Sequence, residues 1–145
     1  MSDPDGAASN DVEEGRRAET LLNDLRVALL RLHKVLLEWE RAGYERIHGR
    51  QSSHDLLQVL LSDPQFAWLR PMSQLIVRID EMLAEKTPPM RNDVEAVISE
   101  VRSLTSPNET GNTYERRYDM ALQEQPDAVF AHRDLIKLLK TPGPV

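Results

Sequence analysis

The segment LLNDLRVALLRLHKVLLEW, residues 21–39, decides the fold, because its apolar residues recur at alternating spacings of three and four. The recurring positions are Leu22, Leu25, Leu29, Leu32, Leu36 and Trp39. This spacing places them on one face of a helix. Further apolar residues at 21, 28, 35 and 42 widen that face, so we expect it to contact more than one neighbouring helix. We predict one long helix from about Glu13 to His48, ended by Gly49.

The rest of the chain predicts shorter helices separated by proline, glycine and asparagine. Their expected ranges are 53–61, 64–85, 93–104, 113–124 and 126 onward. Pro71 interrupts the second range, and the helix there either kinks or breaks at Arg70. Asn92 is expected to cap the third range, and Val129 to lie on the buried face of the last. Residues 106–112, SPNETGN, form a loop by composition.

The fold class that follows is all-α. No segment alternates with period two long enough to indicate a strand. We expect a single-domain bundle of four to six helices over residues 13–140, built on the long N-terminal helix, with short links that favour antiparallel neighbours. Residues 1–12 are expected to be a disordered acidic tail and residues 141–145 a second disordered tail.

Charge and composition narrow the range of partners. Residues 1–15 carry five acidic and no basic side chains, while the remaining residues carry 18 basic and 19 acidic ones. The nearly neutral folded part predicts no nucleic-acid partner. The chain has no cysteine, no apolar run of membrane-spanning length and no signal-peptide pattern at its start. We therefore expect no membrane association and a cytoplasmic location.

A second apolar row on the long helix requires an explanation. Leu30, Leu37 and Tyr44 lie seven residues apart, well away from the main face. Phe66 and Val77 form a similar surplus opposite the main face of the 64–85 helix. Three interpretations compete: another helix of the same chain covers the row, a second copy covers it as a homodimer, or a different protein docks there.

Sites for chemistry are sparse. Glu45 and His48 form a Glu-x-x-His pair, which can hold a metal in a bundle core, but no second pair occurs and these residues lie on the charged side of the helix. Arg116 and Arg117 could contact an anion, but a solvated helix face is the favoured interpretation, because no wider basic surface accompanies them. No spacing nominates a nucleophile or its base, no glycine-rich phosphate loop occurs, and no cofactor is expected.

One stretch has a recognisable signature. The segment DPQFAWLRPMSQLIVRIDE, residues 63–81, resembles a family of small bacterial all-helical proteins that are uncharacterised. The preceding residues 40–45, ERAGYE, and His48-Gly49 are similar too. The resemblance extends over residues 20–85 and implies a bacterial helical protein, without any activity to transfer.

Three functional hypotheses result. The leading one is a non-enzymatic protein-interaction or self-associating helical module that uses Leu30, Leu37, Tyr44, Phe66 and Val77. The alternative is a metal- or small-ligand-binding bundle that uses Glu45 and His48, with Glu40 or Glu38 as a further ligand. A third is an enzyme or nucleic-acid binder whose site forms only in three dimensions.

Overall fold

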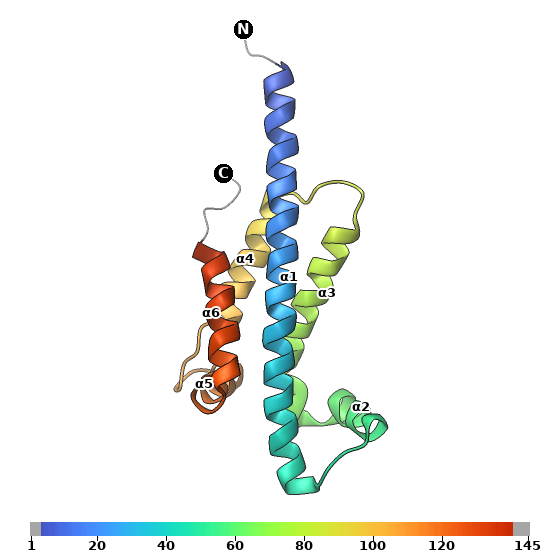
Figure 1. The fold of residues 1–145 in the computed structure, drawn as a ribbon, viewed down its shortest axis with the longest axis vertical. Coiled ribbons are helices and arrows are strands. Elements are labelled where there is room, and N and C mark those ends of the chain that lie inside the picture. Colours follow the sequence, from blue (N-terminus) through green and yellow to red (C-terminus); the bar gives the residue numbers. More distant parts are fainter. Residues whose placement is uncertain (1–3, 141–145) are drawn as a thin grey trace.

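A computed structural model describes residues 4–140 of the chain, with side chains from residue 10 onward. All regular secondary structure in this part is helical, and short loops join the helices (Figure 1). Its elements are α1 (Pro4–His48), α2 (Ser53–Ser62), the 3₁₀ helix η1 (Pro64–Leu69), α3 (Arg70–Ala84), α4 (Arg91–Leu104), α5 (Thr113–Glu124) and α6 (Pro126–Lys140). The predicted all-α class with a long N-terminal helix is confirmed. None of these helices combines the length and the apolar character needed to cross a membrane.

Helix α1 is the axis of the bundle. Figure 1 shows α3 on one side of it, α4 and α6 on the other, and α5 near its C-terminal half. The apolar face predicted from the sequence is buried, since Leu22, Leu25, Leu29, Leu32 and Leu36 are all fully enclosed. They pack against residues of α3, α4 and α6 in one continuous core. The wide apolar face therefore contacts several helices, as its width predicted.

Helix α1 also begins earlier than predicted. Its backbone is helical from Pro4, where a proline suits the first turn, whereas the sequence pattern placed the start near Glu13. The residues from Asn10 to Glu13 are exposed, and Gly15 is the first buried one. A Cβ at Gly15 would lie 2.9 Å from the Cβ of Pro88, so packing begins at this close approach. Residues 1–3 and the predicted tail 141–145 lie outside the described residues.

The end of α1 and the start of α2 follow the predicted signals. Gly49 has a φ of 83°, and its N–H donates to the Glu45 carbonyl at 2.8 Å, which is a left-handed helix stop that glycine adopts without steric cost. The Ser52 hydroxyl then accepts from the Asp55 N–H at 3.1 Å and caps α2.

The helix is not broken at Pro71. A 3₁₀ helix before this proline is followed directly by an α-helix that contains it. The 3₁₀ helix η1 passes directly into α3, and Arg70 itself is helical, with φ −57° and ψ −42°. Because Pro71 lies in the first turn of α3, its missing N–H removes no helical hydrogen bond there.

Two local predictions were wrong. Asn92 does not cap α4, because the helix begins at Arg91, two residues earlier than predicted, and the Val94 N–H donates to the carbonyl of the N-cap residue Met90. Val129 is exposed, because the buried face of α6 is made by Ala128, Ala131 and Leu135. The two small alanines let α6 lie close to α1.

Candidate functional site

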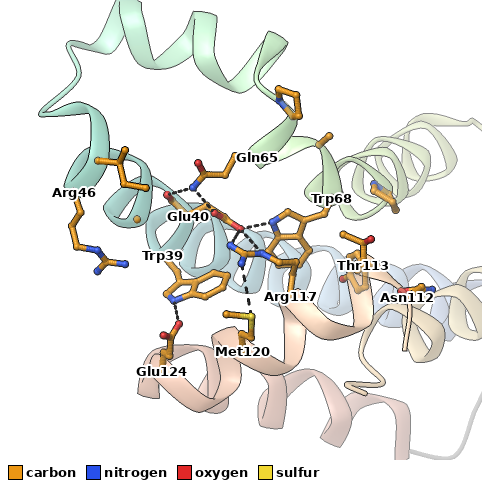
Figure 2. A pocket seen from close by; sticks show the side chains of 16 residues that line it. Trp39, Glu40, Arg46, Gln65, Trp68, Asn112, Thr113, Arg117, Met120 and Glu124 are labelled. Atoms are coloured by element: carbon orange, nitrogen blue, oxygen red, sulfur yellow. Dashed lines mark hydrogen bonds and ion pairs between the residues drawn. The ribbon is translucent and has the colours of Figure 1, made fainter. Parts of the chain in front are cut away.

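A buried carboxylate near the C-terminal end of α1 organises the first candidate site. Glu40 lies four residues after Leu36 and is 1% exposed. Its Oε1 accepts from Trp68 Nε1 at 2.7 Å and from Arg117 Nε at 3.1 Å, and its Oε2 accepts from Gln65 Nε2 at 2.9 Å. Arg117 Nη2 also pairs with Oε1 (Figure 2). These donors offset the cost of removing the carboxylate from water.

Arg117 reaches this carboxylate from α5. Its guanidinium lies over the Trp39 ring, 4.7 Å from the centroid, which is a favourable cation–π geometry. Its Nη1 lies 3.8 Å from the Met120 sulfur, and about a third of the side chain is exposed. The solvated-face interpretation of Arg116 and Arg117 is therefore wrong for Arg117, while Arg116 is exposed.

Aromatic rings continue from this site through the bundle. Trp68 meets Trp39 edge-on at 6.4 Å and Tyr114 at 5.3 Å, and Tyr114 stacks on Tyr118 at 6.0 Å. The Tyr118 hydroxyl lies 2.6 Å from His132 Nδ1. Burial raises the pKa of both tyrosines well above the usual range and lowers that of His132. The contacts among Trp68, Tyr114, Tyr118 and His132 thus connect η1 with α5 and α5 with α6.

A cleft lies beside the buried carboxylate, between α1, η1 and α5. Its volume is about 900 Å³. We call it the Glu40 cleft and define it by six of its lining residues, Trp39, Glu40, Arg46, Trp68, Arg117 and Met120. Figure 2 shows these side chains converging from the three elements.

The second apolar row of α1 lies on a different side. Tyr44 is covered within the chain, since its ring lies 5.8 Å from that of Phe66 and stacks on His48 at 4.2 Å. Phe66 is buried and Leu37 is partly buried against the core. Leu30 is 41% exposed. The row is thus covered by the same chain at its C-terminal end and open at its N-terminal end.

Val77 lies at the same level as Leu30. Arg26 pairs with Asp80, and His33 Nε2 lies 2.7 Å from Ser73 Oγ, so α1 and α3 run antiparallel with Leu30 opposite residues 76 and 77. Val77 is 54% exposed. The two exposed residues predicted for an interaction surface therefore border the same junction of α1 and α3.

A groove lies between α2 and the place where α1 meets η1 and the start of α3, and neither Leu30 nor Val77 lines it. The groove has a volume of about 340 Å³. It is lined by His33, Leu37, Leu57, Leu60, Leu61, Phe66, Leu69, Arg70 and Ser73, and we call it the α2 groove. Helix α2 contains four leucines and a valine, yet none of its residues is buried. Figure 1 shows α2 standing away from the other helices.

The proposed metal ligands are engaged with other groups. The Glu45 carboxylate accepts from Arg41 Nε at 2.6 Å and from the Gln51 N–H at 3.3 Å, and the hydrogen bond from Arg41 lowers its pKa. His48 stacks on Tyr44. Within residues 10–140, no three His, Cys, Asp or Glu side chains gather as a metal site would require. The metal alternative stays a prediction.

Sequence reasoning considered Glu40 only as a further metal ligand and missed its role as a buried, partnered carboxylate. Its spacing from Leu36 continues the buried face of α1, and a carboxylate at such a position signals a partnered buried charge. Its partners could not be read from the chain, because Trp68 and Arg117 are 28 and 77 residues away.

Comparison of the chain with protein-family models, with curated proteins and with solved structures finds no match. The two candidate sites therefore have to be interpreted from their own geometry.

Proposed function

We propose that this protein is a non-enzymatic, self-associating helical module in which the α2 groove of one copy receives α2 of a second copy. The observation that carries the proposal is the exposure of α2. An amphipathic helix of ten residues holds Leu57 and Leu61 at 52% and 68% exposure above an apolar groove. Surface patches of this kind are typical of interaction sites.

A second copy fits this surface better than an unrelated partner of strong charge. A two-fold interface pairs a patch with itself, so the patch must complement its own chemistry. Its apolar part needs only another apolar helix. Arg70 lines the groove and Asp55 lies in the first turn of α2, and neither has an ion-pair partner within residues 10–140. Two-fold pairing would bring these opposite charges together.

The expected affinity is modest. Full burial of a leucine contributes about 1.5–3 kcal/mol. Two leucines, each about half exposed in both copies, therefore contribute roughly 3–6 kcal/mol, and Leu30 and Val77 extend the same side. Association costs at least about 4 kcal/mol. With Leu30 and Val77 counted in the same way, the gain rises to roughly 6–12 kcal/mol and the balance to roughly 2–8 kcal/mol. We therefore expect a dissociation constant in the range of about 10 µM to 1 mM, which corresponds to about 4–7 kcal/mol.

Sedimentation equilibrium over that concentration range tests the proposal. The wild-type chain is expected to show a mass that rises toward twice the monomer. Leu61→Glu should abolish the rise, because a carboxylate would then enter the apolar interface.

The matched control is Phe130→Glu on α6, a residue that is 56% exposed and distant from the groove along the chain. It should associate as the wild type does. A strict monomer at every concentration, or equal loss in the control, contradicts the proposal. A wild-type monomer that binds a helix of another protein through α2 would assign the groove to a different partner and equally reject self-association.

The resemblance of residues 63–81 to an uncharacterised bacterial family supports a bacterial source, and a cytoplasmic location suits the cysteine-free sequence. Both remain parts of the proposal.

A further inference from the structure

The Glu40 cleft has the features of a small-molecule site, and this feature is independent of the α2 groove. We propose that it binds a small organic anion with an aromatic body and a carboxylate group. Its volume of about 900 Å³ lies within the range of about 300–1,000 Å³ that ligand pockets occupy. Its lining also combines apolar side chains with charged and polar ones, and in ligand pockets the polar groups fix the orientation of a ligand whose body lies on apolar walls.

The cationic groups at the cleft favour an anion. Arg46, in the last turn of α1, is exposed and has no ion-pair partner within the described part of the chain. Arg117 Nη1 lies 3.8 Å from the Met120 sulfur, and no oxygen acceptor for it occurs among residues 10–140. A carboxylate is a much stronger acceptor for guanidinium N–H groups than a thioether.

The acidic groups at the cleft are already engaged. Glu40 is surrounded by donors from Trp68, Gln65 and Arg117. Glu124 accepts from Trp39 Nε1 at 2.9 Å. In the view of Figure 2, Glu124 lies below the Trp39 ring and Arg46 to the left of it. An anion is therefore attracted most strongly beside Arg46, whose guanidinium has no carboxylate partner within the described part of the chain.

The apolar walls account for the body of the ligand. Ile47 and Met120 line the cleft and are 77% and 43% exposed. Neither contributes to the core, so covering them with an aromatic ring would remove apolar surface from water at no cost to the packing of the bundle. Trp39 adds an aromatic surface to the lining of the cleft.

The chain provides its own reporter for this site. It has two tryptophans, and both line the cleft. Their indole N–H signals in a ¹H–¹⁵N spectrum therefore report on ligand entry. The Leu61→Glu chain is the right background, because it separates this test from self-association.

The experiment titrates 1-naphthoate and its neutral counterpart 1-naphthamide into that protein. We expect both indole signals to shift with naphthoate and the amide to bind about threefold to fivefold more weakly, which is the effect of one exposed ion pair. Arg46→Gln should remove this preference for the carboxylate. Met120→Ala should weaken both compounds alike.

The control variant is Arg133→Gln, an exposed arginine on α6 that does not line the cleft. It should keep the wild-type preference. The proposal is rejected if the indole signals do not move, if the amide binds as tightly as the acid, or if the control loses the preference as Arg46→Gln does. Unchanged signals elsewhere in the spectrum verify that each variant is folded.

Discussion

Replacing Glu40 with leucine tests whether the buried carboxylate holds α1, η1 and α5 together. The substitution leaves the Trp68 N–H and the Arg117 guanidinium without their acceptor. Removing one partner of a buried ion pair costs about 3–5 kcal/mol. About a third of the Arg117 side chain is exposed, so water can solvate it partly, and we expect the lower end, about 3 kcal/mol. For a domain of this size that lowers Tm by roughly 10 °C.

The assay is urea unfolding followed by tryptophan fluorescence, supported by thermal melts. The matched control is Glu38→Leu, two residues away on α1, whose carboxylate is half exposed and lies 3.9 Å from Arg41. An exposed pair of this kind contributes less than about 1 kcal/mol. The control should therefore unfold close to the wild type.

A double variant separates the ion pair from simple packing. Glu40→Leu combined with Arg117→Leu removes both charges, and such replacements are often tolerated. We expect it to be more stable than the sum of the single effects by about 2 kcal/mol. The proposed role of the buried pair is refuted if Glu40→Leu has the same free energy of unfolding as Glu38→Leu. It is also refuted if the losses caused by Glu40→Leu and by Arg117→Leu add up to the loss in the double variant.

Two further predictions concern pH and the helix stop. Burial lowers the pKa of His33 and His132 in the folded protein. As the pH falls, the unfolded chain therefore binds protons before the folded protein does. The free energy of unfolding is full above about pH 6.5 and declines as the pH falls below that value toward the lowered pKa of the folded state. Urea midpoints between pH 7.5 and 5.5 should decline, and His33→Gln with His132→Gln should flatten the profile; a flat wild-type profile contradicts this. Gly49→Ala should lower the free energy of unfolding by about 1 kcal/mol, because φ is 83° there; the same change at Gly43, inside α1, where an added Cβ would meet nothing closer than 3.5 Å, should be neutral or stabilising.

The helices themselves were readable from local signals. The spacing of the leucines between residues 22 and 36, the glycine at position 49 and the serine at position 52 each act through neighbours within a few residues. The ends of α5 agree with prediction for the same reason. Asn92 shows the limit, because two nearby starts of α4 differ by little in local energy.

The candidate sites depend on contacts that the chain makes over long distances. The sequence predicted that residues 53–61 form a helix. It did not show that none of the leucines of α2 is buried, because this depends on how α2 is placed relative to the other helices. The second row of α1 is covered at Tyr44 by Phe66 and open at Leu30. No periodicity distinguishes these two positions, because coverage depends on which helix arrives.

The sequence by itself determined that this chain is a helical bundle built on α1, because periodicity, caps and glycine stops act between neighbouring residues. The tertiary structure alone decided that Glu40 is a buried carboxylate and that the Arg117 side chain of α5 forms an ion pair with it. The physical reason is that a charge inside a bundle is stable only if donors from distant segments converge on it, and that convergence exists only once the helices have packed.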